Sequence, residues 1–243
     1  MYINSIAKTT ERLDERDQYL YNIPAIAALD TLTLKKPVTF FVGENGTGKS
    51  TLLEAIAVNC GFNPEGGSRD FNFHSVETHS GLHALLRLSK GVPRPKDGFF
   101  LRAESFYNVA SEVDRLADDP SDPFLNSYGG KSLHAQSHGE SFLSLMLNRF
   151  RGSGLYLLDE PEAALSPSRQ MTLLARMHSL VKDGSQFIIA THSPMLMAYP
   201  NAQILLLDGG IKPIDYRQTE HYQITRRFLE APERMLRILF EDD

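Results

Sequence analysis

The stretch Gly43-Glu44-Asn45-Gly46-Thr47-Gly48-Lys49-Ser50 carries the strongest signal in the chain, because it matches the pattern G-x-x-x-x-G-K-S. Residues 37–42, with the sequence PVTFFV, come directly before it, and their unbroken apolar run predicts a buried strand. Residues 52–57 follow it and carry apolar side chains at helical spacing. The order of strand, glycine-rich loop and helix is the context in which this pattern holds phosphate.

Each residue type in this loop suits an anionic ligand. Glycines let successive backbone N–H groups turn inward, and the following helix adds about half a positive charge at its N-terminus. We expect Lys49 to reach the β- and γ-phosphates of a nucleotide and the Ser50 hydroxyl to bind Mg²⁺. The residues predicted to hold the nucleotide here are Gly43, Glu44, Asn45, Gly46, Thr47, Gly48, Lys49, Ser50 and Thr51.

Two further apolar runs end in polar side chains. Residues 155–158 precede Asp159 and Glu160, and residues 187–190 precede a Thr-His-Ser sequence that contains His192. In open α/β sheets, ligands bind at the carboxyl ends of the strands. Asp159 is therefore a candidate Mg²⁺ ligand, directly or through water, and Glu160 is a candidate to polarise the attacking water.

His192 is expected to hydrogen-bond the γ-phosphate and to position the water. A lone histidine is more often structural, and a strand that ends in acids is often only solvated. The shared location of the three strand ends favours function. The predicted catalytic residues are Glu160, His192 and Lys49, and the predicted metal ligands are Ser50 and Asp159.

Buried strands that alternate with helices predict an α/β fold with a parallel sheet and helices on both faces. Short exposed strands are expected within the first 36 residues, and a strand-turn-strand over 204–214. Further predicted segments are a loop at 61–75, a helix at 81–90, a strand at 99–102, a helix at 103–116, a loop at 117–139, a helix at 142–150, a helix that begins after Ser166 and a helical tail at 223–240.

Composition excludes several classes of protein. The chain has 243 residues, 42% of them hydrophobic, which argues against a disordered chain. A single cysteine, Cys60, forbids an intrachain disulfide. The net charge of −5 argues against strong unaided binding to nucleic acid. No apolar run approaches the roughly 20 residues of a membrane span, and no secretory signal is visible, so a cytoplasmic location is expected.

The segment Ser137-His138-Gly139-Glu140-Ser141 precedes an amphipathic helix. Ser137 and Glu140 have the spacing of an N-terminal capping box. The capped helix end also offers its dipole and its hydroxyls to a phosphate. Ser137, Gly139 and Glu140 are therefore further candidate nucleotide contacts, and the two interpretations are compatible.

The order of phosphate loop, serine-glycine segment, Asp-Glu strand end and histidine strand end resembles the ATP-binding-cassette (ABC) ATPases. The serine-glycine segment differs from the usual Leu-Ser-Gly-Gly-Gln of that family at Gln136, His138 and Glu140. The resemblance implies a P-loop fold with antiparallel N-terminal strands and a helical subdomain. It further implies a single domain, with a nucleotide-binding core at 1–75 and 151–214, a helical subdomain at 76–150 and a helical tail at 215–243.

The resemblance also implies a homodimer in which two chains enclose two ATP molecules head to tail. Residues 137–141 of one chain would then contact the γ-phosphate held by the other, and residues 164–166 would communicate across the interface. Glu104 is the nearest polar candidate where such ATPases carry a glutamine-bearing loop. Tyr19 or Tyr21 is a candidate to stack on adenine, and ordinary packing explains either equally well.

Three details resemble small stand-alone ATPases related to chromosome-maintenance, DNA-repair and overcoming-lysogenisation-defect proteins. These are Asn45, Glu162 and the Ala-Thr-His-Ser-Pro sequence at 190–194. They favour an ATP-driven switch that acts on a separate partner, with DNA maintenance or defence as candidate settings. The alternatives are the motor subunit of a membrane transporter and a phosphotransferase. Residues 220–225 match a tail motif of the same group, and their pattern indicates no chemical role.

Overall fold

The computed structural model describes residues 1–69, 80–117, 119 and 122–240. Its main sheet has six strands, which run in parallel except at one edge. In spatial order they are β5 (Asp97–Arg102), β6 (Gly154–Asp159), β7 (Gln186–Ala190), β3 (Val38–Val42), β8 (Gln203–Leu207) and the antiparallel β9 (Ile211–Pro213). This sheet confirms the predicted α/β class.

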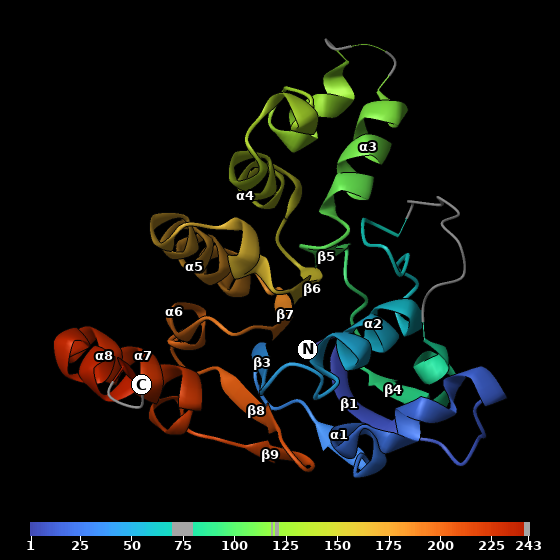
Figure 1. Ribbon diagram of the computed structural model, residues 1–243. Helices are drawn as coiled ribbons and strands as arrows, with labels where there is room; N and C mark the ends of the chain where they lie inside the picture. The colour runs from blue at the N-terminus through green and yellow to red at the C-terminus, as the bar shows by residue number, and fades with distance from the viewer. Residues whose placement is uncertain (70–79, 118, 120–121, 241–243) are drawn as a thin grey trace.

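A second, antiparallel sheet holds the N-terminal strands. Its order is β2 (Thr31–Thr33), β1 (Ile3–Lys8) and β4 (Leu86–Lys90). Figure 1 shows this small sheet beside α2, well away from α3 and α4. The antiparallel N-terminal strands implied by the family resemblance are thus confirmed.

Eight α-helices are described, and Figure 1 shows them on both sides of the main sheet. They are α1 (Pro24–Ala27), α2 (Lys49–Asn59), α3 (Phe106–Leu116), α4 (His138–Arg149), α5 (Pro167–Lys182), α6 (Pro194–Met197), α7 (Glu220–Glu230) and α8 (Pro232–Phe240). Short 3₁₀ segments lie at Glu15–Asn22, Gly81–Leu85, Pro123–Tyr128, Leu133–Ala135, Pro161–Ala164 and Tyr216–Gln218.

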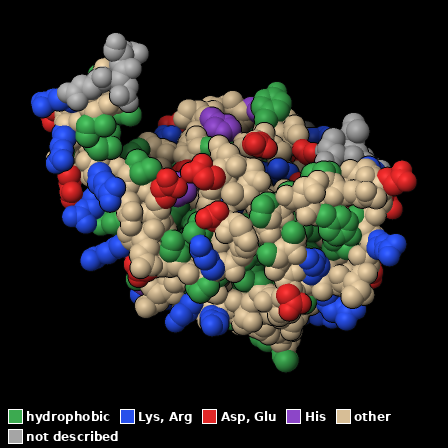
Figure 2. Space-filling view, turned by 60° about the horizontal axis from the view of Figure 1, so that its bottom comes forward, with side chains coloured by type: hydrophobic (Ala, Val, Ile, Leu, Met, Phe, Trp, Pro, Cys, Tyr) green, Lys and Arg blue, Asp and Glu red, His purple; other side chains and the backbone are tan. Residues whose placement is uncertain are grey.

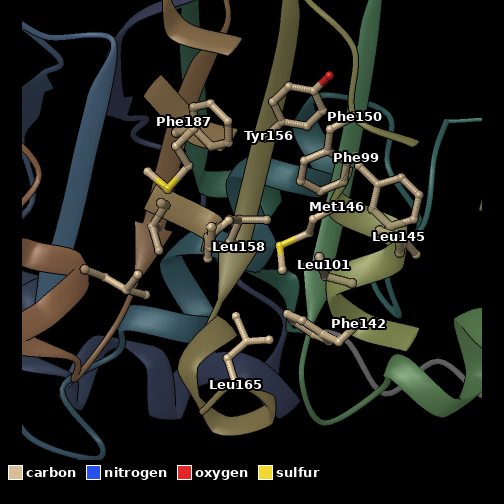
Figure 3. Close-up of a cluster of buried hydrophobic side chains, with 14 of the residues drawn as sticks. Phe99, Leu101, Phe142, Leu145, Met146, Phe150, Tyr156, Leu158, Leu165 and Phe187 are labelled. Carbon is tan, nitrogen blue, oxygen red and sulfur yellow. The ribbon is translucent and has the colours of Figure 1, made fainter. Parts of the chain in front are cut away.

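The central strands are buried on both faces, which explains their unbroken apolar runs. Along β3, Phe40 packs in the cluster under α4 and α5, and Phe41 packs in the cluster that contains α2. Along β6, Leu158 packs in the first of these clusters and Leu157 in the second. Figure 3 shows the first of these clusters, in which side chains from β5, β6 and β7 meet those of α4.

A partly buried polar network fixes the C-terminal end of α4 against the sheet. Arg149, in the last turn, donates to Asp97 Oδ1 at 2.6 Å, and the Tyr156 hydroxyl donates to Asp97 Oδ2 at 2.7 Å. Asp97 begins β5 and Tyr156 lies in β6. The helix that carries the serine-glycine segment is therefore held at one end by charge-assisted hydrogen bonds and along its length by apolar packing.

The structure corrects several predicted elements. Residues 86–90 form β4 instead of a helix, because Leu86 and Leu88 pair with β1 after a short 3₁₀ turn at 81–85. The strands β1 and β2 are half-buried instead of exposed, since Ile3, Ile6 and Leu32 are buried while Asn4, Thr31 and Thr33 are exposed. The segment at 15–27 forms short helices that were not expected. Residues 70–75 of the expected loop at 61–75, and 118, 120 and 121 of the loop at 117–139, lie outside the described residues.

The C-terminal tail also differs from its prediction. It consists of two helices that start at Glu220, and Pro232 separates them because proline is favoured only in the first turn of a helix. Figure 2 shows Lys and Arg side chains and apolar side chains on the projecting left edge, where Figure 1 places α7 and α8. The exposed apolar side chains there include Leu229 and Phe240.

Replacing Phe142 with alanine tests the packing of α4. The Phe142 side chain is fully buried, and we expect Phe142→Ala to lower the free energy of unfolding by about 3–5 kcal/mol. Leu147 lies on the same helix and is 38% exposed, so Leu147→Ala should cost less than about 1 kcal/mol. Urea unfolding of both variants measures the difference. Equal losses would contradict the described packing.

Candidate nucleotide-binding site

Parallel pairing brings three strand ends to one edge of the sheet. Ala190 at the end of β7 pairs with Phe41 of β3 on one side and with Asp159 of β6 on the other. The glycine-rich loop leaves β3 here, Glu160 follows β6 and His192 follows β7. Sheet register therefore places the three predicted polar segments side by side, as the sequence led us to expect.

The loop passes so close to β8 that its first residue has no room for a side chain. Gly43 has a φ of +145°, and a Cβ there would lie 2.5 Å from the Leu207 carbonyl oxygen. Gly48 has a φ of +93°, and a Cβ there would lie 2.8 Å from Ile23 Cγ2. Only glycine fits these two positions, so the backbone geometry of the loop explains both glycines of the sequence pattern.

Lys49 begins α2 and folds back over the loop. Its Nζ atom donates to the carbonyl oxygens of Gly43 at 2.8 Å and Glu44 at 2.9 Å. The side chain is almost fully buried. Burial lowers the pKa of Lys49, while the nearby Glu160 and Asp159 carboxylates favour its charged form. A buried ammonium group at a helix N-terminus is well placed for a polyanion.

The loop encloses a pocket of about 230 Å³. Its lining residues include two with hydroxyl groups, one with an ammonium group and one with a carboxylate. The lining residues are Ile23, Asn45, Gly46, Gly48, Lys49, Ser50, Thr51 and Glu160. The pocket therefore joins most of the predicted loop contacts to the residue that follows β6.

Ser50 and Asp159 form a pair suited to a magnesium ion. The Ser50 hydroxyl donates to Asp159 Oδ1 at 2.9 Å. Burial raises the pKa of Asp159 to about 6, and the Arg102 guanidinium, 3.6 Å from Oδ2, opposes that shift. Mg²⁺ prefers oxygen ligands and is usually held by one or two protein oxygens together with phosphates and water. The hydroxyl and carboxylate of this pair fit that donor set.

Glu160 sits at a strained turn directly after β6. Its φ of 48° and ψ of 50° are left-handed, which is uncommon for a residue with a side chain. The backbone N–H donates to the Ala190 carbonyl at 2.9 Å, so the strand pairing holds the turn. The carboxylate faces the pocket and is 41% exposed. Such strain is often retained at functional positions.

His192 lies against Glu160, with 3.6 Å between His192 Nε2 and Glu160 Oε1. Its backbone N–H donates to the carboxylate of Glu162. The Nδ1 atom lies 2.8 Å from Nε2 of His221, which belongs to α7. Within the described residues, His192 Nε2 is buried and has no hydrogen-bond partner. Burial and the charge of Lys49 lower the pKa of His192, so the neutral ring is favoured.

The serine-glycine segment lies outside the pocket lining. Ser137 and Glu140 form the predicted capping box at the start of α4, and both are exposed. A Cβ on Gly139 would lie 2.5 Å from the Ala164 carbonyl, so the segment packs on the loop after the Asp-Glu pair. The described residues that line the pocket around Lys49 do not include Ser137, Gly139 or Glu140.

The candidates for adenine and for the glutamine-bearing loop receive little support. Tyr19 and Tyr21 are 53% and 41% exposed, and the described pocket lining includes Ile23 instead. Glu104 is 85% exposed, and its carboxylate lies 3.6 Å from Arg102. Neither tyrosine nor Glu104 is brought to the phosphate loop.

Three residues at the site were missed by sequence reasoning. Arg102 ends β5 in register with Asp159, and the rule that strand ends carry function could have identified it. Glu162, which accepts the His192 N–H, was noted only as a mark of family branch. His221 lies 29 residues from His192 and has no local signal that connects the two.

Comparison with known proteins supports the class that the sequence resembles, the ABC ATPases. Residues 21–108 match a family model described as "AAA domain", and residues 139–198 match one described as "AAA domain, putative AbiEii toxin, Type IV TA system". The hemin import ATP-binding protein HmuV of Pseudomonas aeruginosa is 27% identical over 185 residues, which cover 70% of this chain and 71% of that protein. No described helix is both long and apolar enough to cross a bilayer.

One further curated protein and one solved structure are also similar to this chain. The vitamin B12 import ATP-binding protein BtuD of Vibrio atlanticus is 25% identical and matches 72% of this chain and 75% of its own length. The structure of cbiO1 from Clostridium perfringens, part of an ABC transporter complex, has a TM-score of 0.52 at 17% identity and covers 95% of this chain and 96% of its own. These matches support an ABC-class P-loop ATPase, and the fold of the chain is of that class.

Proposed function

We propose that the chain binds Mg-ATP in the pocket of residues 43–51 and hydrolyses it to ADP and phosphate. The observation that carries this proposal is the convergence of Lys49, the Ser50–Asp159 pair, Glu160 and His192 at one sheet edge. An ammonium group, a pair of metal-binding oxygens, a carboxylate and an imidazole are the groups that phosphoryl transfer to water requires.

Each group has a role that follows from its position. Lys49 and the backbone N–H groups at the start of α2 bind the β- and γ-phosphates, once Lys49 Nζ releases the loop carbonyls. Ser50 and Asp159 would hold Mg²⁺, which when bound neutralises charge on the phosphate oxygens. Glu160 orients the attacking water, and His192 donates a hydrogen bond to the γ-phosphate.

The site is completed, in this proposal, by a second copy of the chain. The exposed Ser137, together with Gly139 and Glu140, would face the γ-phosphate bound by the partner in a head-to-tail dimer. Support comes from the exposed N-terminus of α4 and its contact with the loop at 164–166. Residues 1–75 and 151–214 would form the nucleotide-binding core together with β4 and β5, the helices between 106 and 149 would form the helical subdomain, and 215–243 the tail.

The dimer would act in the cytoplasm as a switch for a separate partner. Asn45, Glu162 and the second family description favour a setting in DNA maintenance or defence. The names of the relatives, which are ATP-binding proteins of importers, favour a second candidate function as the motor subunit of a membrane transporter. Both functions use the same ATP-binding site and differ in the partner.

Removing the carboxylate that orients the water should separate binding from hydrolysis. We expect Glu160→Gln to keep ATP binding and to slow phosphate release by about 100-fold or more, because a positioned acid or base contributes on that order. Lys49→Ala should instead lose binding. Calorimetry with Mg-ATP and a phosphate-release assay measure the two effects. Unchanged turnover in Glu160→Gln would remove that residue from the mechanism.

A bulky charge at the serine-glycine segment should block the dimer. Ser137→Arg is expected to spare ATP binding and to prevent the dimer that Glu160→Gln accumulates with Mg-ATP, because the arginine would fill the space meant for the partner's phosphate. Ser179→Arg, on the exposed surface of α5, is the matched control. Size-exclusion chromatography with light scattering gives the masses. A Ser137→Arg protein that still dimerises on ATP would leave the segment with its capping role alone.

The two candidate settings predict different captured partners. The ATP-bound Glu160→Gln protein should retain its partner from cells of its own source, because hydrolysis no longer resets the switch. An integral membrane protein among the captured chains would establish the transporter function. DNA-stimulated ATP turnover of the natural chain at low salt would support the DNA-maintenance setting, and its absence would exclude direct action on DNA.

A further inference from the structure

The first turn of α7 places His221 beside His192, and the proposed mechanism gives His221 no role. Thr219 caps this helix by accepting the Tyr222 N–H at 3.4 Å, and its hydroxyl donates to the Tyr216 carbonyl at 2.7 Å. Thr219 is 2% exposed, although the rest of α7 is largely exposed. The cap fixes the direction of the turn that holds His221.

His221 and His192 form a direct ring-to-ring hydrogen bond. His192 Nδ1 and His221 Nε2 are 2.8 Å apart, and the ring centroids are 4.9 Å apart with an interplanar angle of 59°. Both rings are partly buried. Burial and the charge of Lys49 lower the pKa of both, while Glu44 acts on both in the opposite direction. These shifts favour the neutral form of both rings.

Two neutral imidazoles can share this bond in only two ways, since one nitrogen donates and the other accepts. If His192 donates from Nδ1, its Nε2 carries no proton and presents a lone pair toward Glu160. If His221 donates from Nε2, His192 Nε2 carries the proton. His192 Nε2 is the atom that lies 3.6 Å from Glu160, and it is buried without another partner. Only a protonated Nε2 can donate to an anionic phosphate.

We propose that His221 is a positioning residue that donates its Nε2–H to His192 Nδ1 and thereby holds His192 in the Nε2–H form. This inference rests on the proposed hydrolysis of ATP. The other nitrogen of a functional histidine commonly sets its tautomer and its ring orientation. A chemical role is thereby assigned to the tail motif at 220–225, which the local sequence pattern left unexplained.

The kinetic test uses two substitutions at the same position in the full chain. His221→Phe keeps a ring but has no donor, and we expect kcat for ATP to fall about 10- to 100-fold with KM changed less than twofold, on the scale seen when partners of metal-bound histidines are removed. His221→Gln keeps an N–H donor and should retain several-fold more activity than His221→Phe. His178→Phe, a histidine on α5 away from the pocket, should leave kcat unchanged.

Nitrogen-15 NMR of the histidine rings reports the tautomer directly and does not depend on any His221 variant folding. In the natural chain with Mg²⁺ and a β,γ-methylene analogue of ATP, His192, assigned with His192→Ala, should show the Nε2–H form. His221→Phe should shift His192 toward a mixture of tautomers. An Nδ1–H form in the natural chain would overturn the inference.

The outcomes separate this inference from the function on which it rests. If His192→Ala and Glu160→Gln lose turnover while His221→Phe does not, the inference fails and the proposed function stands. Equal losses in His221→Phe and His221→Gln would also overturn the donor role. If His192→Ala and Glu160→Gln both keep full turnover, the roles assigned to these two residues fail. If the natural chain neither binds nor hydrolyses Mg-ATP, the proposed function itself fails.

Discussion

The parallel hydrogen-bond register between β3, β7 and β6 is the constraint on which the site depends. It sets Phe41, Ala190 and Asp159 side by side at the carboxyl edge of the sheet. A slip of one residue would exchange the two faces of a strand, and both faces here are buried in separate apolar clusters. The cores above and below the sheet thus fix the polar groups at its edge, and the energy that positions the site comes from apolar packing far from it.

Lys49 and Ser50 at this edge are hydrogen-bonded within the chain, whereas His192 Nε2 is buried without a partner among the described residues. Lys49 Nζ is hydrogen-bonded to two loop carbonyls, and the Ser50 hydroxyl to Asp159. An unpaired buried charge would cost several kcal/mol, about as much as breaking a buried ion pair. Binding of a triphosphate with its metal would therefore exchange these contacts for equivalent ones. Such an exchange would keep Lys49 and Ser50 paired, and this suits a site that must bind and release its ligand repeatedly.

Local patterns predicted the parts of the fold that depend on neighbours in sequence. The glycine-rich loop, the three apolar runs and the capping box at Ser137 were all readable, because strand burial and helix caps leave short-range signals. Long-range pairing was not readable. Residues 86–90 form a strand because they pair with the edge of β1. Arg102 lies beside Asp159 because of the register between β5 and β6. Tertiary context overrides local preference in both cases.

The contact between His192 and His221 extends the site from the sheet to the tail. α7 is held at its first turn by the buried Thr219, whereas Ile224 and Leu229 farther along it are 51% and 73% exposed. A hydrogen bond of 2.8 Å between two rings depends on both distance and angle, so a small rotation of α7 about its cap would weaken it. A helix fixed at one end transmits such a rotation to that end. If His221 holds the tautomer of His192 as proposed, a change in the orientation of α7 would also change that tautomer.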